Sequence, residues 1–120
     1  MKKKDYLYLL LLTIIPLFIL LFVKSQHLIF GNSIDWFNQH VTIADTLRHA
    51  IRNEGTIFPT YLSNLMGGVN IYHFSYYGTL RFDILLGALL IDIKMVDIII
   101  FYQIFLMIVT MITCYLFLKA

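Results

Sequence analysis

The sequence predicts an all-α integral membrane protein: two transmembrane helices joined by an extracytoplasmic segment that holds amphipathic and interfacial helices. Hydrophobic residues make up 60% of the 120 positions, charged residues only 13%, and two long apolar runs contain no charge. Soluble domains carry about a quarter charged residues, and at this size they bury only about 60–70% of their surface. The surplus apolar surface therefore indicates contact with lipid.

The two apolar runs cover residues 6–23 and 98–118. At 1.5 Å per residue the first run reaches about 27 Å, which is close to the hydrocarbon thickness of a bilayer. It lacks the small-residue pattern of a cleavage site, so we expect an uncleaved anchor rather than a signal peptide. A shorter apolar stretch, Ile84–Ile91, is bracketed by charges and predicts an interfacial helix over about 79–93.

Lysines set the predicted orientation. Residues 1–5 form a basic terminus with Lys2, Lys3 and Lys4, and basic residues beside a span stay cytoplasmic. Two crossings then return Lys119 to the cytoplasm and leave residues 24–97 outside. The net charge of +2 is too small to indicate a nucleic-acid partner.

The outer segment predicts a surface helix over about 33–53, followed by an aromatic and glycine-rich loop over 56–78. Asn32 or Ser33 would cap the helix, and Gly55 would end it. Its apolar positions recur at three- and four-residue steps. They are Ile34, Phe37, Val41, Ala44, Leu47 and Ile51. In the loop, Gly67 and Gly68 indicate a turn or a close backbone approach.

Asp35 is the candidate catalytic residue, because it lies just beyond the first span near the start of the surface helix. A carboxylate there can bind a divalent cation or accept a proton from a hydroxyl. The alternative is structural: with Asn32 as the cap, Asp35 would favour the helix dipole by about 0.3–1 kcal/mol.

Five further residues are candidates for substrate binding. Asn38 and Gln39 broadly share a helix face with Asp35, whereas His40 should point elsewhere. These side chains can hydrogen-bond a sugar or a phosphate, or they can form a hydrated helix face. Tyr76 and Tyr77 belong to an aromatic cluster that suits a membrane–water interface, although such rings can also stack on a sugar or line a groove for a lipid tail.

Residues 31–40, 64–72 and 74–78 together resemble the amino-terminal part of the YfhO family of bacterial membrane proteins. The most specific strings are Asp-Trp-Phe-Asn-Gln-His at 35–40 and Phe-Ser-Tyr-Tyr-Gly at 74–78. The resemblance implies the start of a GT-C-like multi-span fold in a bacterial cell membrane. It also implies a glycosyltransferase that moves sugar from a polyprenyl-phosphate donor to a cell-envelope polymer such as lipoteichoic acid.

In enzymes of this type, an acidic residue in the first outer loop takes part in catalysis or holds a metal, and Asp35 occupies the matching place. A divalent cation is the candidate cofactor, and the sequence does not specify which metal it is. Family members are several hundred residues long, so the resemblance implies an amino-terminal fragment that is inactive alone. The alternatives are a component of a lipid-sugar flippase or transporter, and a small non-enzymatic membrane protein.

Overall fold

The computed structural model describes residues 3–25, 34–62, 67–78 and 80–119. It divides into two compact units. We call residues 1–30 and 100–120 the helix pair, and residues 31–99 the small lobe. Most described residues are helical. In chain order the elements are α1 (Lys3–Ser25), η1 (Trp36–Val41), α2 (Thr42–Glu54), β1 (Tyr61–Leu62), β2 (Val69–Asn70), η2 (Ile71–Tyr77), α3 (Phe82–Leu89) and α4 (Met95–Lys119).

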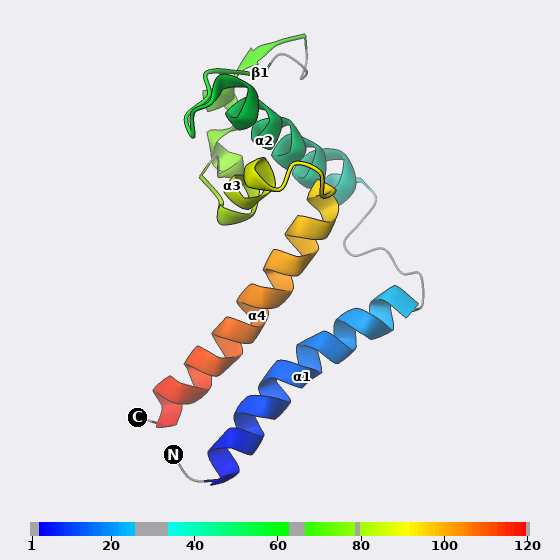
Figure 1. Cartoon of the computed structure of the whole chain (residues 1–120), viewed down its shortest axis with the longest axis vertical. Helices are drawn as coiled ribbons and strands as arrows, with labels where there is room; N and C mark the ends of the chain where they lie inside the picture. Colours follow the sequence, from blue (N-terminus) through cyan, green and yellow to red (C-terminus); the bar gives the residue numbers. More distant parts are fainter. Residues whose placement is uncertain (1–2, 26–33, 63–66, 79, 120) are drawn as a thin grey trace. The chain divides into compact units, whose positions relative to one another are not determined.

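Both predicted spans are continuous helices that extend beyond the apolar runs (Figure 1). α1 begins at Lys3 and α4 begins at Met95, so each helix includes charged residues of its first turn. Both are long and apolar enough to cross a membrane. Long apolar runs without charge favour helix because every backbone polar group is then paired within the segment.

The helix pair is joined at one end by a polar cluster. Lys119 Nζ forms an ion pair with Asp5 Oδ2, and the Tyr115 hydroxyl donates a 2.9 Å hydrogen bond to Asp5 Oδ1. The Tyr8 and Tyr115 rings lie nearby, with centroids 5.9 Å apart. The first turns of α1 therefore meet the last turns of α4.

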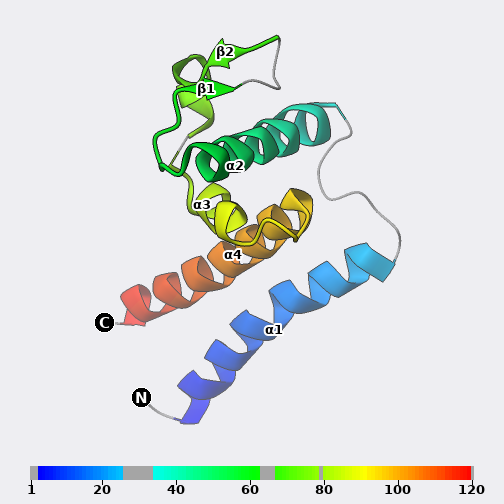
Figure 2. The ribbon, with the colours of Figure 1, turned by 45° about the horizontal axis from the view of Figure 1, so that its top comes forward.

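The small lobe is built around α2, which lies between the β1–β2 hairpin and α3 (Figure 2). The predicted apolar stripe is confirmed from Val41 onward, because Val41, Ala44, Leu47 and Ile51 are buried. Ile34 and Phe37 are exposed instead. The core is completed from β1, η2, α3 and the start of α4. Its other members are Ile43, Ala50, Leu62, Ile71, Phe74, Ile84, Ala88, Met95 and Ile99.

The predicted loop over 56–78 contains regular structure. β1 and β2 pair antiparallel, with Tyr61 opposite Asn70 and Leu62 opposite Val69. The turn predicted for the paired glycines is confirmed, since Gly67 and Gly68 both have positive φ just before β2. At Gly68 an added Cβ would lie 1.8 Å from the Tyr61 hydroxyl oxygen, so a side chain approaches closely there. Strands of two residues carry no readable alternation, which is why the sequence predicted only a loop.

The helix predicted over about 79–93 is shorter, because α3 covers only Phe82–Leu89. One face is buried against the core, with Ile84 fully covered, while Phe82 and Leu89 are more than two-thirds exposed. Charged groups anchor this region: Arg81 Nε donates to Asp83 Oδ1 at 3.0 Å, and Arg48 Nη1 donates to the Ile93 carbonyl oxygen at 2.6 Å.

The surface helix predicted over about 33–53 is divided into η1 and α2. The two candidate caps, Asn32 and Ser33, lie outside the described residues. The predicted stop is confirmed, because Gly55 ends α2 with φ of +64°, a backbone conformation that residues with a Cβ rarely adopt.

Candidate functional site

η1 is a single turn of π-helix over Trp36–Val41, directly before α2. The Thr42 hydroxyl bonds the carbonyl oxygen of Phe37, five residues back, at 3.1 Å. Single π-turns are rare and often occur at functional sites, because they change the direction of consecutive side chains. Here the turn carries Gln39 and His40, two of the predicted binding residues.

Both of these side chains contact Tyr77, which is the centre of the site. The Tyr77 hydroxyl donates a 2.7 Å hydrogen bond to Gln39 Oε1. The His40 ring meets the Tyr77 ring edge-on, with centroids 5.3 Å apart. Sequence reasoning placed His40 off the face that Asn38 and Gln39 share with Asp35. In the structure the Gln39 amide contacts the Tyr77 hydroxyl and the His40 ring contacts the Tyr77 ring.

The 3₁₀ helix η2 positions Tyr77. Asn70 caps the start of η2, with its side-chain oxygen accepting the Tyr72 amide at 2.9 Å. Ile71 and Phe74 fix η2 to the core, since both are buried. Gly78 then ends η2 with φ of +78°. The site thus joins two segments almost forty residues apart in sequence.

Tyr76 adds a second phenol ring, whose centroid lies 4.5 Å from that of Tyr77. Partial burial raises the pKa of Tyr77 above its usual value of 10.0, with further contributions from Tyr76 and from the negative charge of Asp35. Because even the usual pKa of a phenol is about 10, the Tyr77 hydroxyl is protonated at physiological pH and serves as the hydrogen-bond donor to Gln39.

Asp35 lies at the amino-terminal end of η1 and is exposed. Its side chain makes no capping hydrogen bond to the helix, and its charge acts on Tyr77. Asn38 is also exposed on this turn. The structure thus brings Gln39, His40, Tyr76 and Tyr77 into one aromatic–amide cluster, with Asp35 within electrostatic range. We call Asp35, Gln39, His40, Tyr76 and Tyr77 the Tyr77 cluster.

Within the described ranges, no three side chains of His, Cys, Asp or Glu come together in a way that could hold a metal ion. A cation at Asp35 would therefore need other ligands, such as substrate phosphate oxygens or water.

Sequence reasoning missed two polar residues that organise the lobe. Arg48 is only 5% exposed and pairs with Asp45 as well as with the Ile93 carbonyl. Glu54 accepts the backbone amides of Thr60 and Tyr61 at 3.0 and 3.3 Å. The available signal for Arg48 was its place on the apolar stripe, four residues after Ala44.

Comparison of this chain with protein-family models, with curated proteins and with solved structures finds no match.

Proposed function

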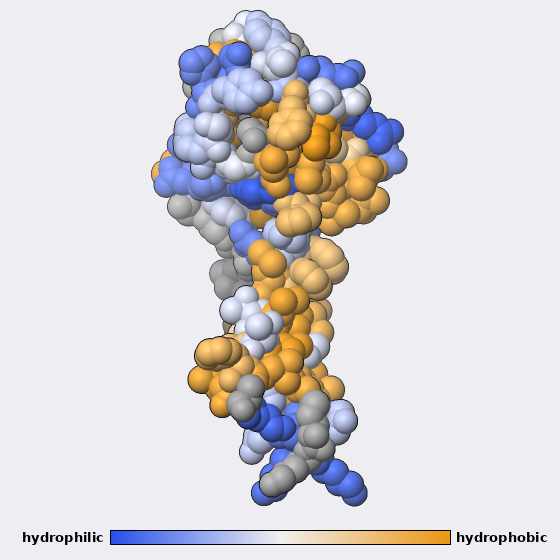
Figure 3. Space-filling model, turned by 90° about the vertical axis from the view of Figure 1, so that its left-hand side faces the viewer, coloured by the Kyte–Doolittle hydropathy of each residue, from blue (hydrophilic) through white to orange (hydrophobic). Residues whose placement is uncertain are grey.

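We propose that α1 and α4 cross a bacterial cell membrane, with residues 24–97 on the outer side. The helices contain 23 and 25 residues, which is about 35–38 Å of helix and more than the hydrocarbon core requires. Large apolar side chains along both are open to the surroundings: Phe18 is 67% exposed and Phe117 is 79% exposed. Figure 3 shows this apolar surface along the helices, with hydrophilic residues at their far end.

The polar cluster of the helix pair supports the orientation. The ion pair between Asp5 and Lys119 brings the basic start of α1 and the basic end of α4 to the same end. Lys3 and Lys4 lie in the first turn of α1, so three lysines are gathered there. Basic residues flanking spans favour the cytoplasmic side.

We further propose that the chain is part of a YfhO-type, GT-C-like glycosyltransferase that moves a sugar from polyprenyl phosphate to a cell-envelope polymer. The observation that carries the proposal is the Tyr77 cluster. Residues chosen from two separate strings of the sequence meet at one ring, beside an exposed carboxylate. A surface that offers phenol, imidazole and amide groups beside a carboxylate suits a sugar phosphate and an incoming hydroxyl.

The proposed reaction is a displacement at the anomeric carbon of the donor sugar. The acceptor oxygen forms a bond to that carbon while the bond from the carbon to the lipid-phosphate oxygen breaks. The acceptor proton passes to the Asp35 carboxylate, and the electron pair of the broken bond leaves with the phosphate. The Tyr77 hydroxyl, whose proton is donated to Gln39, would accept a hydrogen bond from a sugar hydroxyl, and the His40 ring would hydrogen-bond the sugar or the departing phosphate.

The test is Asp35→Asn in the complete gene product, expressed in cells that lack the native copy. We expect the sugar content of the extracted lipoteichoic acid or wall polymer to fall at least 100-fold, because loss of a general base typically costs about 10²–10⁴-fold. The matched control is Asp92→Asn, an exposed carboxylate in the turn between α3 and α4. Unchanged polymer glycosylation with Asp35→Asn would refute the catalytic role.

A further inference from the structure

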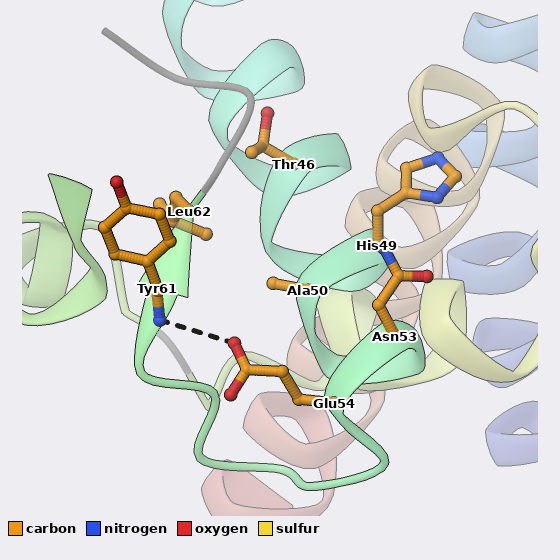
Figure 4. A pocket seen from close by; sticks show the side chains of 7 residues that line it. All are labelled: Thr46, His49, Ala50, Asn53, Glu54, Tyr61 and Leu62. Atoms are coloured by element: carbon orange, nitrogen blue, oxygen red, sulfur yellow. Dashed lines mark hydrogen bonds between the residues drawn. The ribbon is translucent and has the colours of Figure 1, made fainter. Parts of the chain in front are cut away.

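A separate pocket of about 170 Å³ lies between α2 and β1 (Figure 4). Five side chains come from α2 and two from β1. They are Thr46, His49, Ala50, Asn53, Glu54, Tyr61 and Leu62. None of these residues belongs to the Tyr77 cluster, and the sequence analysis selected none of them as a binding residue.

The walls of this pocket are held in place by interactions of their own. The Glu54 carboxylate at the end of α2 accepts the Thr60 and Tyr61 amides, so α2 and β1 are tied together at the pocket edge (Figure 4). On the hairpin side, the Tyr61 hydroxyl lies against Gly68, where no Cβ would fit. A binding site whose walls are already fixed loses little entropy when a ligand enters.

The lining combines an apolar floor with a polar rim. Ala50 and Leu62 are buried, whereas Tyr61 is 53% exposed and offers the face of its ring. Asn53 is an exposed residue of the lining, and its side-chain amide carries two donors and an acceptor. Apolar surface with a few convergent polar groups is typical of small-molecule sites.

Charge and size narrow the ligand class. Glu54 lines the pocket, and Asp45 lies 3.9 Å from the His49 ring, so the local field disfavours a phosphate or a carboxylate. The volume is well below the roughly 300–1,000 Å³ of sites for drug-sized ligands. A single neutral ring that carries hydroxyl groups meets both limits.

We propose that this pocket binds one neutral sugar ring of the acceptor polymer. Thr46 follows Gln39 by seven residues, in the helix that directly follows η1, so the two sites lie on consecutive helices of the small lobe. The Tyr77 cluster would hold the donor, and the pocket would hold a ring of the acceptor chain. The assignment to an acceptor rests on the proposed function, whereas the assignment to a sugar ring rests on the pocket alone.

The experiment measures binding of methyl glucoside, methyl galactoside and N-acetylglucosamine to the complete gene product in detergent micelles, by saturation-transfer NMR. We expect saturable binding of at least one of these sugars, and no binding of inorganic phosphate. Thr46→Val combined with Asn53→Ala should weaken the binding at least tenfold. Tyr61→Leu should weaken it independently.

Thr42→Val is the matched control, because Thr42 and Thr46 each bond a carbonyl of the preceding turn but only Thr46 lines the pocket. Far-UV circular dichroism confirms that the variants fold. The sugar site is refuted if the wild type binds none of the sugars or binds only phosphate. It is also refuted if the Thr46→Val, Asn53→Ala variant binds sugar as tightly as the Thr42→Val variant does. Asp35 does not line the pocket, so Asp35→Asn should still bind the sugars. The sugar-binding result can therefore be interpreted even if Asp35 proves not to be catalytic.

Discussion

The helix pair and the small lobe are stabilised in opposite ways. In the small lobe, α2 is covered on two sides and buries residues such as Leu47, which is 1% exposed. In the helix pair, apolar side chains point outward, and Leu17 is 43% exposed although it lies mid-helix. The lobe thus buries its own apolar side chains, whereas the large apolar side chains of the helix pair are open to the surroundings.

The two regions also place their buried charged groups differently. The small lobe uses Arg48 and Asp83 inside or beside its core, each with a partner of opposite charge. In the helix pair, the buried carboxylate of Asp5 lies at the end of the helices with Lys119. A span that keeps its charges at its ends avoids the cost of placing them within lipid.

The largest expected effect comes from shortening leucines in the two regions. Leu47→Ala should lower the free energy of unfolding of the small lobe by about 2–5 kcal/mol, because it leaves a cavity in a packed core. Leu17→Ala should cost the helix pair less than about 1 kcal/mol, because lipid replaces the lost contacts. Hydrogen exchange of α1 and α2 amides in micelles measures both. Equal losses would contradict the contrast between the regions.

The next effect concerns the buried arginine. Arg48→Met should destabilise the small lobe by about 1–3 kcal/mol, since the Ile93 carbonyl loses its donor. The partner carboxylate of Asp45 is 41% exposed and can be hydrated, which limits the loss. Arg52→Met is the control: its bond to the Ala88 carbonyl is 3.3 Å and the residue is exposed, so we expect a loss below about 0.5 kcal/mol. Denaturant titration followed by tyrosine fluorescence compares the two variants.

A third test concerns the turn before β2, where two consecutive glycines have positive φ, a feature that α1 and α4 lack. Gly67→Ala should lower the free energy of unfolding by about 1–2 kcal/mol, because alanine rarely adopts the φ of +78° found there. The space around Gly67 is open, so no steric clash adds to this loss. Gly68→Ala should cost about 1 kcal/mol more than Gly67→Ala, because the Tyr61 hydroxyl must also move away from the new Cβ. Thermal unfolding of the two variants gives the difference. A milder loss for Gly68→Ala would show that Tyr61 does not rest on this turn.

The smallest effect is the part of the pH dependence that comes from Tyr77 in the small lobe. The pKa of Tyr77 is raised in the folded state, chiefly by burial, so the folded state binds its proton more tightly than the unfolded state does. The resulting stability is fully present below pH 10.0 and is lost as the pH rises through the folded value. Unfolding measured from pH 8 upward should show this decline. Tyr77→Phe should reduce it, and an unchanged slope would contradict the assigned cause.

The sequence predicted the two long helices and the stop at Gly55 because those signals are local. A charge-free run of eighteen or more residues and a glycine after an apolar stripe each act through neighbouring residues. It also selected Gln39, His40, Tyr76 and Tyr77, but from separate strings. Their meeting is a tertiary contact between η1 and η2, which no local residue pattern predicts.

The hairpin, the short α3 and the burial of Arg48 depend on tertiary contacts. Two-residue strands are too short to show a periodic pattern, and Arg48 is covered by α3 at Gly87 and bonded to the Ile93 carbonyl, both far away in sequence. Glu54 illustrates the same limit. In the sequence Glu54 is an ordinary polar residue at a helix end, but in the structure its carboxylate accepts the Thr60 amide and fixes the start of β1. Such roles become visible only when distant segments are placed together.

The most direct test of the central claim is the side of the membrane on which the small lobe lies. Cys114 is the only cysteine, so Cys114→Ser provides a background for single-cysteine variants. In intact cells, Thr56→Cys should react with a membrane-impermeant maleimide, whereas Lys3→Cys should react only after lysis. The chain should remain with the membrane after carbonate extraction. Labelling of Thr56→Cys only after lysis, or release of the chain by carbonate, would contradict the account.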